Sequence, residues 1–98
     1  MDKIKIAEYL LENNIKASTA GFHYLIDVIE MACKCGRGVK IGTLRWAVAD
    51  KYCVSTASVE RAIRYALISS GYTKAQSEFV SIAVIRLESG ANDSGSAV

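Results

Sequence analysis

Two arginines and a glutamate stand close together in the run Val-Glu-Arg-Ala-Ile-Arg-Tyr. A guanidinium group can donate paired hydrogen bonds to O6 and N7 of guanine, and a glutamate can accept one from N4 of cytosine. Arg61 and Arg64 are three residues apart, so a helix would place them on one exposed face together with Glu60 and Tyr65. This set is typical of a helix that contacts base edges in the major groove of DNA.

Hydroxyl side chains come directly before this set, and a basic loop lies further upstream. Ser55 or Thr56 can cap the start of the helix, and Ser58 follows in its first turn. Free backbone N–H groups at a helix N-terminus, and hydroxyl groups beside them, suit phosphate oxygens. We therefore expect these three residues at the DNA backbone, together with Arg37 and Lys40 from the basic loop.

The charge is distributed unevenly along the 98 residues, although the net charge is only +2. Residues 31–74 carry eight Lys and Arg and two acidic residues, which gives +6, whereas the segments on either side carry −2 each. A basic centre between acidic ends indicates a polyanion that meets one face of the molecule. The alternative is a chance clustering of solvated charges.

The elements that must position these side chains are helices. The chain has no proline and few glycines, and 51% of its residues are hydrophobic. Apolar residues recur at helical spacing in five segments, and no segment shows a sustained period of two. We expect an all-α fold, a small helical bundle, with helices over about residues 2–13, 20–34, 42–52, 56–70 and 75–88.

The apolar stripes of these five helices predict the core. Its expected members are Ile4, Ala7, Leu10, Leu11, Phe22, Leu25, Ile26, Ile29, Ala32, Cys33, Leu44, Ala47, Val48, Tyr52, Val59, Ala62, Ile63, Ala66, Leu67, Phe79, Ile82, Ala83 and Leu87. The third and fourth helices, with a short turn at residues 53–55, are arranged like a helix-turn-helix, in which the second helix enters the groove. Residues 1–88 form one domain, and the Ser- and Gly-containing residues 89–98 are expected to be a flexible tail.

Other kinds of site are weaker candidates. Cys33, Cys35, Cys53 and His23 could supply four zinc ligands, but their spacing is not that of paired C-x₂-C sites, so we expect no metal and no cofactor. No nucleophile or acid–base pair emerges, which argues against an enzyme. Trp46 is interpreted as partly buried packing. An odd number of cysteines, and no apolar run that could cross a bilayer, favour the cytoplasm of a bacterium and no membrane partner.

Three stretches resemble a known family in the order in which that family has them. They are residues 21–25 (Gly-Phe-His-Tyr-Leu), residues 48–52 with 59–66 (Val-Ala-Asp-Lys-Tyr and Val-Glu-Arg-Ala-Ile-Arg-Tyr-Ala), and residues 77–79 (Ser-Glu-Phe). The chain is similar over about residues 10–88 to the C-terminal DNA-binding effector domain of the stage-zero master regulator of sporulation in endospore-forming bacteria.

The resemblance implies a transcription regulator that binds promoter DNA, often as head-to-tail copies. It implies that Glu60, Arg61 and Arg64 face base edges and that Ser55 and Thr56 lie near phosphate. We expect the domain to be monomeric until it pairs on DNA. The alternative function is a helical protein-interaction module that kept the fold without DNA binding.

The chain departs from the family at three points. Ser58 stands where the family usually has an arginine, and the stretch between Ser70 and Lys74 is shorter than in the family, which deletes a small helix. The family's phosphoacceptor receiver domain does not accompany the match. The match without a receiver domain is compatible with two alternatives. The chain is either an excised effector domain or a stand-alone regulator without a phosphorylation switch.

Overall fold

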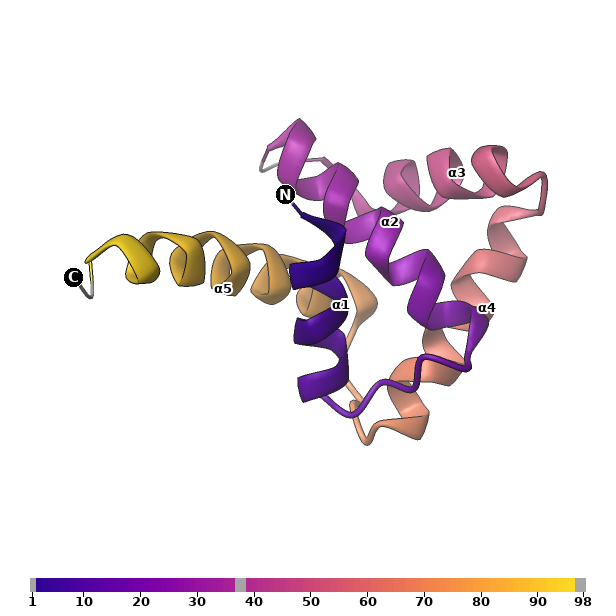
Figure 1. The fold of residues 1–98 in the computed structure, drawn as a ribbon. Coiled ribbons are helices and arrows are strands. Elements are labelled where there is room, and N and C mark those ends of the chain that lie inside the picture. Colours follow the sequence, from indigo (N-terminus) through magenta and orange to yellow (C-terminus); the bar gives the residue numbers. More distant parts are fainter. Residues whose placement is uncertain (1, 37–38, 97–98) are drawn as a thin grey trace.

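The computed structural model describes residues 2–36 and 39–96, and the side chains of residues 2–36 and 39–89. Over these residues the chain forms five helices and no strand, which confirms the all-α fold (Figure 1). The helices are α1 (Lys3–Glu12), α2 (Ala20–Cys35), α3 (Ile41–Tyr52), α4 (Thr56–Ser69) and α5 (Gln76–Ser96). Their order matches that expected from the apolar spacing, and so do the approximate bounds of α1 to α4 and the start of α5.

Three of the helices begin at a residue that caps them. The side chains of Asp2, Thr19 and Ser55 each accept a hydrogen bond from a backbone N–H two or three residues further on, at 2.9, 3.3 and 3.1 Å. Such a cap satisfies one of the N–H groups that have no partner within the helix. By contrast, α3 begins after Lys40 without a side-chain cap.

The turn between α3 and α4 is fixed by its backbone. Cys53 adopts the left-handed conformation with φ 57°, and the Val54 N–H donates to the Ala49 carbonyl at 3.0 Å. This pattern closes the end of α3 within three residues and lets α4 start at once. The pair expected to form the helix-turn-helix is therefore present as two helices joined by residues 53–55.

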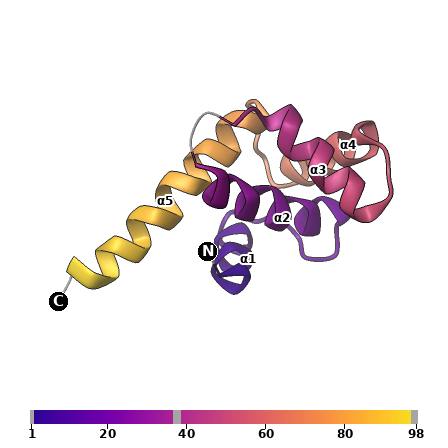
Figure 2. The same ribbon diagram turned by 90° about the horizontal axis from the view of Figure 1, so that it is seen from above.

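Helix α2 lies at the centre and packs against each of the other four helices. Figures 1 and 2 show α3 and α4 together at one end, α1 alongside α2, and α5 extending away from the rest. The buried apolar side chains form one cluster. Its members are Ile6, Leu10, Ile15, Phe22, Leu25, Val28, Ile29, Ala32, Leu44, Val48, Ala49, Val59, Ile63, Ala66, Leu67, Phe79, Val80, Ala83 and Val84.

Several expected core residues lie outside this cluster. Ile4 is 68% exposed and Leu11 is 52% exposed, because α1 turns Ile6 and Leu10 toward the core instead. Tyr52 and Ile82 are also exposed. Other predicted members are only partly buried, namely Ala7, Ile26, Cys33, Ala47, Ala62 and Leu87. The side chains of residues two positions apart on a helix point about 200° away from each other. A helix with apolar residues on both sides therefore has two faces that could be buried.

Helix α5 is longer than its apolar spacing predicted. It continues past Glu88 to Ser96. The predicted flexible tail, residues 89–98, overlaps this end of the helix, and its flexibility stays a prediction. Residues 97 and 98 lie outside the described residues.

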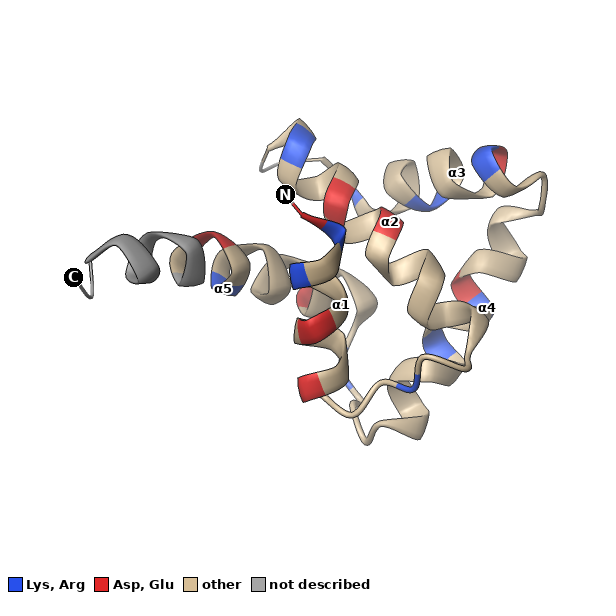
Figure 3. Cartoon of the chain, in the orientation of Figure 1, with Lys and Arg blue, Asp and Glu red and all other residues tan. Residues whose placement is uncertain are grey.

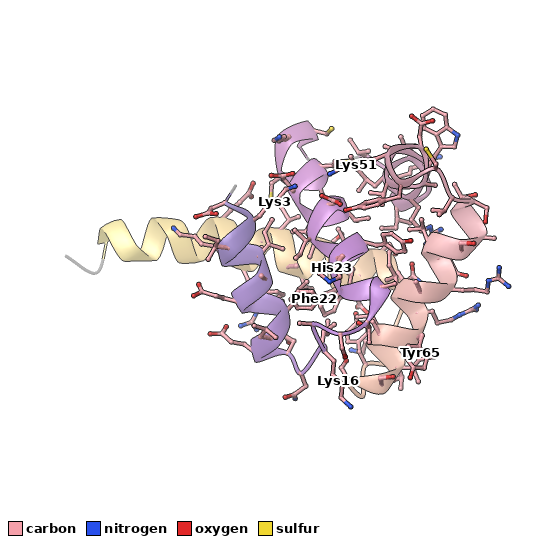
Figure 4. The ribbon with its side chains drawn as sticks, turned by 45° about the vertical axis from the view of Figure 1, so that its right-hand side comes forward. Lys3, Lys16, Phe22, His23, Lys51 and Tyr65 are labelled. Carbon is pink, nitrogen blue, oxygen red and sulfur yellow. The ribbon has the colours of Figure 1, made fainter. Side chains whose placement is uncertain are left out.

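A buried aspartate joins three of the helices. The Asp27 side chain, on α2, is 3% exposed and lies 3.3 Å from Lys3 Nζ of α1 and 3.1 Å from Lys51 Nζ of α3. The Tyr52 hydroxyl donates a short hydrogen bond to the same carboxylate. Figure 4 labels both lysines near α2. No local sequence pattern predicts this cluster, because its members come from three separate helices.

Replacing Asp27 with asparagine is expected to lower the free energy of unfolding by about 2 kcal/mol at neutral pH, because hydrogen bonds to a charged acceptor are lost. Burial pushes the pKa of Asp27 up, but hydrogen bonds from Tyr52 and Lys51 outweigh it, and the pKa lies below its usual value. The stabilisation is therefore complete above the unfolded-state pKa of about 4 and is lost as the pH falls through the lower folded-state pKa.

Urea denaturation at several pH values measures this effect. The difference in the free energy of unfolding between wild type and Asp27→Asn should become smaller below about pH 4. Asp50→Asn, at an exposed aspartate of α3, is the matched control and should change little. A difference that stays constant down to acid pH would contradict the role of the ionised carboxylate.

Candidate nucleic-acid interface

One face of α4 is buried and the opposite face is open. Its buried residues, Val59, Ile63, Ala66 and Leu67, anchor the helix in the core. Ala62 and Ala66 also lie directly against the backbone of Gly21 in the first turn of α2. Helix α4 is therefore held rigidly, with its remaining face turned to solvent.

The exposed face carries most of the residues singled out from the sequence. Arg61, Arg64, Tyr65 and Ile68 are exposed on it. Arg61 forms no ion pair with any other residue that the structure describes. Figure 4 labels Tyr65 on α4, and Figure 3 shows basic positions on both α3 and α4. The expected clustering of these side chains on one helix face is thus present.

Glu60 lies at the edge of this face and is half-buried in a polar network. Its Oε1 is 3.3 Å from Arg64 Nη2, and its Oε2 accepts a hydrogen bond from Gln76 Nε2 at 3.2 Å. The same Gln76 nitrogen donates to the Glu60 backbone carbonyl at 2.9 Å. In turn, Gln76 Oε1 accepts a hydrogen bond from Arg45 Nη1 at 2.8 Å. Gln76, the first residue of α5, therefore connects α3 with α4.

This network orients Glu60 and, through it, Arg64. An exposed pair four residues apart on a helix contributes only about 0.3–0.5 kcal/mol. Arg64 can therefore exchange its contact with Glu60 for one with a ligand at little cost. Arg45 and Gln76 were not predicted as site residues, because no local sequence pattern indicates them.

The hydroxyl residues at the start of α4 are already partly engaged. The Ser55 oxygen accepts a hydrogen bond from the Ser58 N–H at 3.1 Å, and its hydroxyl donates to Ser58 Oγ at 2.9 Å. Ser58 is half-buried, whereas Thr56 is exposed. Lys40 is exposed at the start of α3, and Arg37 lies outside the described residues.

Most of the chain, including α3 and α4, matches one known family. Residues 6–92 match the model described as "Sporulation initiation factor Spo0A C terminal". The chain belongs to the Spo0A C-terminal family. This is the family of a DNA-binding effector domain of a transcription regulator of sporulation, so the resemblance seen in the sequence is confirmed. No curated protein and no solved structure matches the chain.

The Spo0A C-terminal family is a family of DNA-binding domains rather than of enzymes. The thiols of Cys33, Cys35 and Cys53 are free, and burial raises the pKa of Cys33, which makes it a weaker nucleophile. Among the described residues no group of His, Cys, Asp and Glu could hold a metal ion. In the same part of the chain no helix has the length and apolar character that a bilayer span requires.

Proposed function

We propose that the chain is a sequence-specific regulator of transcription that binds double-stranded promoter DNA. In this proposal α3, its turn and α4 form the helix-turn-helix, and α4 enters the major groove. The observation that carries the proposal is the exposed face of α4, on which Arg61 and Arg64 stand opposite a fully buried stripe. The family match also supports DNA as the partner.

The side chains of α4 have distinct roles in this proposal. Arg61 forms the two-pronged contact with a guanine, because no other described side chain competes for its guanidinium. Glu60, Arg64 and Tyr65 contact neighbouring bases. Both Glu60 oxygens are engaged in the free protein, so its contact with a base requires Arg64 to turn away from it toward the DNA.

The DNA backbone is held from both sides of the turn in the same proposal. Ser55, Thr56 and Ser58 meet one phosphate at the start of α4, and Arg37 and Lys40 meet another near the start of α3. Two copies lie head to tail on adjacent sites, with the protein monomeric in the absence of DNA. A regulator of this kind acts in the cytoplasm, where it meets the chromosome.

Binding to DNA is tested by selecting a preferred site from random duplexes and then titrating that site and a random duplex at two salt concentrations. The preferred site is expected to bind about a thousandfold more tightly than the random duplex. Affinity for both falls steeply with salt, with a slope of about −0.9 for each phosphate neutralised. Equal affinities for the two duplexes would contradict sequence specificity. The absence of any salt-dependent binding would favour the protein-interaction module.

A further inference from the structure

Trp46 is a strongly solvent-exposed tryptophan. It lies on α3 and is 64% exposed, so the partly buried packing interpreted from the sequence is wrong. A neighbour three residues away on the same helix, Ala49, takes a buried position instead. Tryptophan is enriched at interfaces, where its apolar ring is covered and its N–H finds a hydrogen-bond partner.

The surroundings of Trp46 show where such a partner would sit. The indole borders a shallow hollow between the first half of α3 and the first turns of α4. The residues lining it are Gly42, Arg45, Trp46, Thr56, Ala57 and Glu60. Two of these residues are small and leave the space open. A Cβ atom built on Gly42 would meet nothing within 4 Å.

The hollow continues directly from the exposed face of α4. Thr56, Ala57 and Glu60 belong to α4 and line the hollow, and Arg61 follows in the same turn. Any duplex that places its bases against Arg61 therefore runs its backbone close to this hollow. The Arg45 guanidinium supplies a positive charge there, beside the Glu60 carboxylate, one oxygen of which accepts a hydrogen bond from Gln76.

We infer that Trp46 binds the sugar–phosphate backbone of the DNA strand that passes the N-terminal end of α4, which deepens the proposed function and rests on it. The flat face of the indole covers a deoxyribose, and the Nε1–H donates to a phosphate oxygen, which can only accept. The contact reads no base. It therefore strengthens binding to every sequence alike and fixes the position of α4 in the groove.

The test uses Trp46 itself as the probe, because it is the only tryptophan in the chain. Its emission is recorded while the full chain is titrated with the preferred duplex, and acrylamide quenching is measured before and after. We expect the emission to change at the same duplex concentration as the anisotropy of a labelled duplex. Acrylamide quenching should fall once the complex has formed.

Two substitutions at Trp46 distinguish the contribution of the aromatic ring to binding from that of its N–H group. Trp46→Ala should weaken binding about fivefold to tenfold on the preferred and the random duplex alike, as expected for one polar contact and its packing. Trp46→Phe keeps an aromatic ring without the donor and should recover part of the loss. Ile85→Ala, at a 47% exposed residue of α5, is the control and should bind as the wild type does.

The outcomes distinguish this inference from the function on which it rests. A wild-type protein that binds duplex while its emission and acrylamide quenching stay unchanged overturns the role of Trp46 and leaves the proposed function intact. A Trp46→Ala variant with wild-type affinity does the same. A wild-type protein that binds no duplex at low salt overturns both. Circular dichroism of each variant checks that these exposed positions do not affect folding.

Discussion

Gly21→Ala is expected to lower the free energy of unfolding by about 3 kcal/mol. A Cβ atom at this position would lie 2.7 Å from the Ala66 Cβ and closer still to the Ala62 carbonyl oxygen, both in α4. A backbone oxygen cannot turn aside as a flexible side chain can. The two helices must therefore separate, and this cost outweighs the gain of about 1 kcal/mol that alanine normally gives over glycine within a helix.

The same substitution at a second glycine is the matched control. Gly42→Ala, in α3, would place its Cβ where nothing lies within 4 Å, so it should raise the free energy of unfolding by up to about 1 kcal/mol. Urea denaturation followed by circular dichroism measures both variants. We expect the free energy of unfolding to fall in Gly21→Ala and to rise in Gly42→Ala. Equal stability of Gly21→Ala and wild type would show that α2 and α4 are less tightly packed than the structure has them.

The helices and their starts were predictable because their causes are local. Asp2, Thr19 and Ser55 cap helices through hydrogen bonds that reach no further than three residues along the chain. The stripe on α4 was identified for a similar reason. Its polar and apolar residues alternate with the period of the helix, so only one face could be buried, and four of its five predicted members are.

The choice of face could not be predicted where a helix is apolar on more than one side. On α1 both Ile4 and Ile6 are good core residues, and the position of α2 decides between them. On α5 the core takes Val80 and Val84 and leaves Ile82 exposed for the same reason. Packing against neighbouring helices, rather than spacing along the helix, determines which face is buried. A single sequence shows only the spacing.

The polar contacts of the site were partly beyond the reach of the sequence. That Arg61 and Arg64 share a face with Tyr65 follows from their spacing alone. The contact between Glu60 and Gln76 could not be predicted from spacing, because the two residues are sixteen positions apart and meet only once α5 has docked. Arg45 contacts Gln76 across thirty-one residues of sequence. The sequence predicted that Arg61, Arg64 and Tyr65 face solvent, but not which polar groups of the site are already engaged.

Arg61→Ala is expected to weaken binding to the preferred duplex by about 1–3 kcal/mol and to change binding to a random duplex much less. Arg61 is exposed on α4 and has no ion-pair partner among the described residues, so its loss leaves no buried charge behind and does not endanger the fold. The difference between the two duplexes therefore measures base recognition. Arg61→Lys should be damaging as well, because an ammonium group cannot form the two-pronged contact with guanine.

Lys40→Ala provides the contrast, because Lys40 is exposed at the start of α3 and is not part of α4. If Lys40 meets phosphate, its removal should weaken both duplexes alike and lower the salt slope by roughly one. Titrating both duplexes with the three variants at two salt concentrations resolves base contacts from backbone contacts. Should Arg61→Ala leave both affinities unchanged, α4 is not the helix that recognises the site, and the protein-interaction module becomes the better account of its exposed face.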